Sequence, residues 1–274
     1  MENDGKMIKS RKDGDLLYLF LAPLAVIGFW FGVEALLEHF SSSAELLKRA
    51  PILRTLPYLF AILLLVAFEK HRMGKGWKST LGQFGLRSPR APQLTITFIG
   101  IAVLAIGYTL SFHLWGEAPE LRATWASSAL KFLLEAGLAE ELLFRGFLFR
   151  RLRERYSFAR SACLSGLVFG SIHLINLTNG LSSDVLVSVG ISILAGVLVT
   201  FPLAALFEVG GGSLLGGIVF HFAVDTINLF HGVGSVGMVA CLGIAALSGL
   251  VVFFLSFRAL RARGQNLSVR PGQT

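Results

Sequence analysis

The sequence predicts an all-α protein that crosses a membrane about eight times as a helical bundle, with both termini in the cytosol. Of its 274 residues, 54% are hydrophobic and only 15% are charged, and the mean hydropathy is +0.67. An average soluble domain carries roughly 25% charged residues. Apolar runs of about 20 residues, the length that a helix needs to cross the hydrocarbon core, recur along the chain. We therefore expect a single integral membrane domain over residues 1–274.

The apolar runs define the predicted spans in order. The first run follows a basic N-terminus and is about as long as a true span, so we predict a membrane helix and not a cleaved signal peptide. The second run is interrupted near its start by Arg54 and Pro57, which predicts a tilted or partly interfacial helix. The eight predicted spans are Leu16–Leu37, Pro51–Phe68, Leu94–Trp115, Trp125–Phe149, Phe158–Leu177, Val185–Phe207, Ser213–Phe230 and Val236–Phe257.

The loops between these spans differ strongly in basic residues. Segments on the side of the N-terminus hold Lys6, Lys9, Arg11, Lys12, Lys70, Arg72, Lys75, Lys78, Arg87, Arg90, Arg150, Arg151, Arg153, Arg155, Arg160, Arg258, Arg261, Arg263 and Arg270. Segments on the other side hold Lys48, Arg49, Arg54 and Arg122. Because cytoplasmic loops are rich in Lys and Arg, this asymmetry predicts cytosolic termini. The same asymmetry explains the net charge of +8, because the basic residues flank the membrane spans. We therefore expect no nucleic-acid partner.

The fourth predicted span carries charges that hydrocarbon disfavours. An ionisable residue inside a membrane is by default a candidate functional residue. At 100° per residue, four of the five charges form one ladder, which contains Lys131, Glu135, Glu141 and Arg145. Within it, Glu141 and Arg145 have the i,i+4 spacing of a helical ion pair. Glu140 lies outside the ladder, which predicts a carboxylate that is left free for chemistry.

Two later spans carry histidines. Phe169 and His173 lie four residues apart in the fifth span, and His221, Asp225 and Asn228 follow i, i+4, i+7 spacing in the seventh. One histidine on an apolar helix is usually a satisfied core residue. Two histidines and an unpaired glutamate on three helices instead favour a shared site. At 1.5 Å per residue, the three groups lie about 12–22 Å from the cytoplasmic ends of their spans, which is compatible with one depth.

A carboxylate and two imidazoles around a wet cavity suit hydrolysis. Glu140 would act as general base on water, while one histidine shares the water and the other donates to the developing oxyanion. The alternative is a site in which Glu140, His173 and His221 hold a divalent metal such as Zn²⁺. The His-Glu-x-x-His pattern of many zinc proteases is absent, and no serine nucleophile stands out.

Three short motifs resemble those of one protein family. They read Glu140-Glu141-Leu-Leu-Phe-Arg145-Gly, Phe169-Gly-Ser-Ile-His173 and His221-Phe-Ala-Val-Asp225. In sequence and order they resemble the CAAX prenyl endopeptidase and bacteriocin-processing family, which comprises helical intramembrane proteases. The first motif is fairly specific, whereas the other two gain weight from their placement on successive spans. The resemblance implies a catalytic core over about residues 90–257.

The resemblance also implies a role for each motif residue. Glu140 matches the catalytic glutamate, His173 the histidine that helps it activate water, and His221 the histidine on the oxyanion side. Asp225 matches the partner of that histidine, although the family motif often ends in Asn. An ionised Asp cannot donate to an oxyanion, so it would orient His221, stabilise the protonated form of that ring, or itself be protonated as burial allows. The amide of Asn228, one turn on, is the alternative donor.

Supporting roles and the metal question follow from the same resemblance. Glu141 and Arg145 match supporting positions, and Phe169 belongs to the second motif. The best-understood branch of the family is described as glutamate-dependent, which favours a mechanism without a metal cofactor.

We therefore expect an endopeptidase that cleaves a peptide bond near the cytoplasmic face of the cell membrane. Its expected partners are the lipid bilayer and a peptide or protein substrate, which the resemblance suggests is prenylated or a C-terminal membrane-associated segment. One alternative is a non-catalytic immunity or scaffold protein that retains the motifs for packing. A transporter with a proton relay is another, but no internal repeat is visible, which argues mildly against it.

Overall fold

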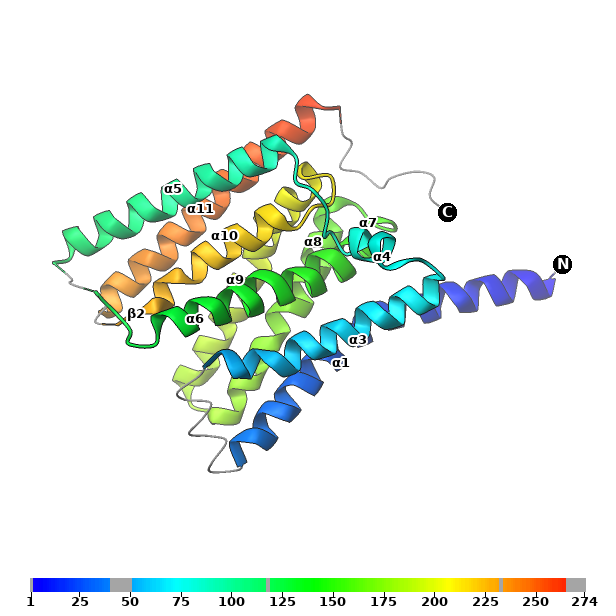
Figure 1. Cartoon of the computed structure of the whole chain (residues 1–274), viewed down its shortest axis with the longest axis horizontal. Helices are drawn as coiled ribbons and strands as arrows, with labels where there is room; N and C mark the ends of the chain where they lie inside the picture. Colours follow the sequence, from blue (N-terminus) through cyan, green and yellow to red (C-terminus); the bar gives the residue numbers. More distant parts are fainter. Residues whose placement is uncertain (1, 40–50, 117–118, 232–233, 265–274) are drawn as a thin grey trace.

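The computed structural model describes residues 2–39, 51–116, 119–231 and 234–264, and nearly all of them are helical (Figure 1). The helices are α1 Glu2–His39, η1 Pro51–Thr55, α3 Leu56–Met73, α4 Trp77–Gln83, α5 Ala91–Leu114, α6 Trp125–Phe132, η2 Leu133–Phe149, α7 Arg150–Arg153, α8 Phe158–Ser171, η3 Ile172–Asn179, α9 Ser183–Val209, α10 Leu215–Asp225, η4 Thr226–Leu229 and α11 Ser235–Ala262. Two short strands, β1 Glu120–Leu121 and β2 Phe230–His231, pair antiparallel. The predicted all-α bundle is confirmed. Lys48, Arg49 and Arg270, used in the topology argument, lie outside the described residues.

Six helices of the described chain are long and apolar enough to cross a membrane. They are Leu16–Leu37, Ile52–Met73, Ala91–Leu114, Phe158–Thr178, Ser183–Val209 and Val236–Ala262, and each coincides with a predicted span. The other two predicted spans correspond to α6 with η2, which is rich in ionisable residues, and to the shorter apolar segment Leu215–Leu229. The chain is thus a multi-pass membrane protein. The count of eight spans stays a prediction.

The helices pack as pairs around a central segment (Figure 1). The pair α5 and α11 lies at one edge of the bundle, and the pair α1 and α3 lies at the other. Between them lie α6 with η2, which pack against α10, and the pair α8 and α9. In that last pair the backbones approach closely: a Cβ on Gly170 would lie 2.7 Å from the carbonyl oxygen of Ile193. Small residues permit such approach between membrane helices.

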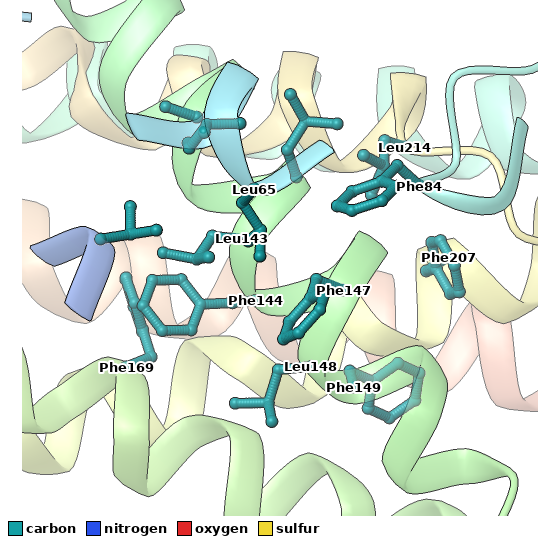
Figure 2. Close-up of a cluster of buried hydrophobic side chains, with 14 of the residues drawn as sticks. Leu65, Phe84, Leu143, Phe144, Phe147, Leu148, Phe149, Phe169, Phe207 and Leu214 are labelled. Atoms are coloured by element: carbon teal, nitrogen blue, oxygen red, sulfur yellow. The ribbon is translucent and has the colours of Figure 1, made fainter. Parts of the chain in front are cut away.

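The central segment η2 is a π-helix that forms the middle of the core. At its end, the N–H of Arg150 donates to the carbonyl of Arg145, which is the i→i+5 bond of that helix type. Large apolar side chains from η2 meet others from α3, α8, α9 and the segments around α4 and α10, as Figure 2 shows. The labelled set contains Leu65, Phe84, Leu143, Phe144, Phe147, Leu148, Phe149, Phe169, Phe207 and Leu214. This packing fixes the helix that carries the candidate site.

The first turns of α1 and the last turn of α11 lie at the same end of the bundle as α4 and α7 (Figure 1). This end holds most of the basic residues that the positive-inside rule assigns to the cytosol. The arrangement is the one expected when both termini lie on one side. That this side is cytosolic stays a prediction.

Candidate functional site

The π-helix changes how the charges of the fourth predicted span are arranged. The sequence argument assumed 100° per residue, but i→i+5 bonding widens each turn. The four charges of the predicted ladder are paired with one another, in two ion pairs. Lys131 Nζ lies 3.1 Å from Glu135 Oε1, and Arg145 Nη1 lies 2.9 Å from Glu141 Oε1. The second of these pairs confirms the predicted i,i+4 contact.

One imidazole lies between the two adjacent glutamates. His221, on α10, places Nδ1 3.0 Å from Glu141 Oε1 and Nε2 3.8 Å from Glu140 Oε2. The first distance is a hydrogen bond, whereas the second is too long for one. Both glutamates thus face the same histidine, which the predicted separation of Glu140 from Glu141 did not anticipate. Arg145 forms its ion pair with Glu141 and not with Glu140.

The Glu141–Arg145 pair is completely buried and held from a neighbouring helix. Both residues are 0% exposed. Arg145 Nη2 donates to Thr200 Oγ1 on α9 at 3.1 Å, and that hydroxyl donates to the carbonyl of Gly196 at 2.9 Å. The guanidinium also lies 5.0 Å from the centre of the Phe169 ring, a cation–π contact. These contacts leave the guanidinium and the Glu141 carboxylate little freedom to move.

Phe169 contacts both histidines. Its ring centre lies 6.4 Å from that of His173 and 6.0 Å from that of His221. His173 belongs to η3, and its side chain is half-buried. In the described part of the chain, no hydrogen bond or ion pair joins His173 to Glu140, so His221 is the imidazole paired with that carboxylate. The predicted role of His173 on the attacking water stays a prediction.

The third motif ends in Asp225, whose predicted role as partner of His221 stays a prediction. The Nδ1 of the His221 ring is hydrogen-bonded to Glu141. Asp225 is the last residue of α10 and is half-buried. The side chain of Asn228 is exposed, and its backbone carbonyl accepts a hydrogen bond from Arg122 Nε at 3.0 Å. The imidazole is therefore hydrogen-bonded to a carboxylate on a different helix, that of Glu141.

The metal alternative can be compared with the same geometry. Across residues 2–39, 51–116, 119–231 and 234–264, no group of three or more His, Cys, Asp or Glu side chains is arranged to hold a metal ion. Glu140, His173 and His221 do not form such a group. Whether the reaction needs a metal stays a question for experiment.

Two neighbours of the site were missed from the sequence. Thr200 looked like an ordinary polar residue of an apolar span, yet it is fully buried against Arg145. Gly217 lies one helical turn before His221, and a Cβ there would lie 2.8 Å from Glu141 Oε2. That i,i+4 spacing to a histidine was the available signal for close approach by another helix.

Comparison with known proteins agrees with the motifs. Residues 122–227 match the family model described as type II CAAX prenyl endopeptidase Rce1-like. This segment is similar to that family. The match confirms the family resemblance, and it includes all three motifs from Glu140 to Asp225. No curated protein matches the chain.

The Rce1-like segment begins just before α6 and ends in η4. It contains every contact described above among Glu140, Glu141, Arg145 and His221. The helices α1, α3, α5 and α11 lie outside it and pack around it. The predicted core over residues 90–257 is wider than the match, and its boundaries stay a prediction.

Proposed function

We propose that this protein is an intramembrane endopeptidase in which Glu140 activates the water that attacks the scissile carbonyl. The observation that carries the proposal is the array Glu140, His221, Glu141 and Arg145 inside the Rce1-like segment. A buried carboxylate costs free energy in a membrane and is seldom retained without a partner or a function. The neighbour of Glu140 is an imidazole that a second carboxylate holds in place, which is an arrangement suited to proton transfer.

In the proposed reaction, water adds to the carbonyl carbon of the substrate while Glu140 takes one of its protons. The carbonyl oxygen becomes an oxyanion. The peptide C–N bond then breaks as the proton moves from Glu140 to the departing nitrogen, which leaves a carboxylic acid and an amine. The two protons of water are thereby divided between the products, and Glu140 returns to its starting state.

His221 would stabilise the oxyanion. With Nδ1 hydrogen-bonded to Glu141, the ring places Nε2 3.8 Å from Glu140 Oε2, beside which we propose that the scissile carbonyl binds. A protonated ring can donate a hydrogen bond from Nε2 to the developing charge. Glu141 compensates the positive ring, and Arg145 balances Glu141. We assign His173 a part in holding the water, and Asp225 or Asn228 a part on the oxyanion side.

We further propose that the substrate is a membrane-associated peptide, either prenylated or a C-terminal segment, cut near the cytoplasmic face of the cell membrane. The proposed reaction is metal-free. A metal-dependent form of the same protease would use Glu140, His173 and His221 with an ion such as Zn²⁺.

The test is mass spectrometry of membrane peptides from cells that carry the wild-type protein, Glu140→Gln or Glu135→Gln. Glu135 is a matched control because it lies on the same helix but pairs with Lys131. We expect Glu140→Gln to abolish specific cleavage products at unchanged protein abundance, and Glu135→Gln to retain them. Normal cleavage by Glu140→Gln would refute the proposed base.

The same measurement separates the alternatives. Cleavage that persists in the presence of a chelator supports the metal-free reaction, whereas its loss, restored by Zn²⁺, supports the metal-dependent one. A non-catalytic protein predicts no difference in membrane peptides among the variants. Its biological effect would instead follow protein abundance.

A further inference from the structure

The connection between α3 and α5 is strongly basic. Residues 70–90 contain six Lys and Arg side chains and no Asp or Glu, and no acidic residue follows until after α5. The basic residues are Lys70, Arg72, Lys75, Lys78, Arg87 and Arg90. The positive-inside rule accounts for their side of the membrane. It does not account for how they are arranged on the folded connection.

One face of α4 is anchored in the core. Thr80 is fully buried, and Phe84, directly after the helix, is 2% exposed and stacks on Phe147 of η2 at 6.0 Å between ring centres. Figure 2 shows Phe84 beside Leu214 and Phe147. Arg150 of α7 donates to the carbonyl of Gln83 at 2.6 Å. The helix is therefore docked on the bundle and does not hang free from it.

The connection is also bonded to the turn between α9 and α10. Leu214 N donates to the carbonyl of Gly85 at 3.0 Å, and Ser213 Oγ donates to the carbonyl of Arg87 at 2.9 Å. Arg87 Nη1 donates to the carbonyl of Gly211 at 3.3 Å. These hydrogen bonds fix the position of α4 at the end of the bundle.

The opposite face of α4 combines cations with an exposed aromatic ring. Trp77 is 52% exposed, and Lys70 Nζ lies 5.1 Å above its ring. Lys75 and Lys78 are exposed on either side of it. No described carboxylate forms an ion pair with Lys75 or Lys78. The carboxylates of Glu69, on α3, and Glu154, after α7, pair with arginines.

We propose that Lys70, Lys75, Trp77 and Lys78 form a binding surface for the headgroups of anionic phospholipids, which we name the α4 surface. Tryptophan prefers the boundary between headgroups and acyl chains, and lysines beside it attract anionic lipids. Trp77 and Lys78 lie on the docked helix α4, Lys75 on the turn before it and Lys70 on the last turn of α3. A lipid phosphate beside the lysines and acyl chains beside the ring satisfy both kinds of group at once.

The test uses the purified full-length protein in detergent micelles and measures the unfolding temperature with added phosphatidylglycerol or phosphatidylcholine. We expect phosphatidylglycerol to raise it by about 2–4 °C more than phosphatidylcholine does. The difference should shrink at high salt, because salt screens exposed charges. Glycerol phosphate without acyl chains should give no shift, and a full shift from it would show a site for free phosphate instead.

Two double variants with equal loss of charge decide whether the α4 surface is responsible. Lys75→Gln with Lys78→Gln removes two cations from the surface, while Arg160→Gln with Arg258→Gln removes two exposed cations elsewhere. We expect the first variant to lose at least half of the phosphatidylglycerol effect and the second to keep it. Equal losses in both variants, or no preference for phosphatidylglycerol in the wild type, would overturn the proposal. None of these readouts depends on peptidase activity.

Discussion

Two buried carboxylates, Glu69 and Glu140, lie in clusters with different degrees of pairing. Glu69 is 0% exposed, and both of its oxygens are engaged, since it accepts from Tyr18 at 2.6 Å and from two arginines. Glu140 is 9% exposed, and its ion-pair partner is the imidazole of His221, 3.8 Å away. A carboxylate with all of its acceptors used stabilises a fold. One with unused acceptors beside an oriented imidazole is suited to chemistry.

The same difference appears within the candidate site. Glu141 Oε1 lies close to both Arg145 and His221. Its buried Oε2 has no hydrogen-bond partner among the described residues. Glu141 is thus a positioning residue that orients His221. The pairing of the carboxylate oxygens is least complete at Glu140, intermediate at Glu141 and complete at Glu69. The proposed roles change in the same order, from catalysis through positioning to stability.

The largest expected effect comes from exchanging the two kinds of carboxylate for amides. Glu140→Gln should lower cleavage by about 10²–10⁴-fold, the contribution of a general base, with little change in unfolding temperature. Glu69→Gln should lower the unfolding temperature but leave cleavage by the remaining folded protein near the wild-type rate. A peptidase assay and a thermal scan on both variants check this. Loss of activity in both at equal folded fraction would remove the distinction.

Arg145→Met should destabilise the protein by about 3–5 kcal/mol, because it leaves the Glu141 carboxylate buried without its cation. The unfolding temperature and the yield of folded protein in detergent measure this effect. The double variant Glu141→Gln with Arg145→Met should be less destabilised than the sum of the two single variants, since neither charge is then left alone. Additive losses would show that the pair does not interact as its 2.9 Å separation indicates.

The sequence predicted those parts of the site that depend on local spacing. The apolar runs located the spans, and the i,i+4 rule located the Glu141–Arg145 pair. Glu140 and His221 were named from their placement on apolar helices and from the motifs, and the structure brings them together.

The parts that failed depend on helix type and on contacts between helices. The positions of the charges were calculated for an α-helix, and no sequence pattern that we used predicts the π-helix from Leu133 to Phe149. The hydrogen bond between His221 and Glu141 joins residues 80 positions apart, which spacing within one helix cannot predict. Glu69 was placed in a soluble loop, but it is buried because α1 and α7 cover it with Tyr18 and Arg151.

Thr200→Val should destabilise the protein by about 1–3 kcal/mol, because a buried guanidinium N–H loses its acceptor while the side-chain volume is retained. If Arg145 positions Glu141 and His221, the turnover rate should also fall, with a smaller effect on the substrate concentration at half-maximal rate. Thr109→Val is the control, since its hydroxyl bonds only to its own helix on an exposed face. Equal effects from the two variants would rule out a special role for the Thr200–Arg145 contact.

The smallest effect should come from removing an ion pair that is exposed to solvent, although its charged groups are of the same kind as those of the buried pairs. Arg150 Nη2 lies 3.5 Å from Glu154 Oε1, and the glutamate side chain is 47% exposed. Exposed i,i+4 pairs contribute about 0.3–0.5 kcal/mol, so Glu154→Gln should change the unfolding temperature by no more than about 2 °C and should leave cleavage unchanged. A loss as large as that of Arg145→Met would mean that burial does not set the strength of these pairs. The contrast between Glu69 and Glu140 would then have to rest on something other than how completely each carboxylate is paired.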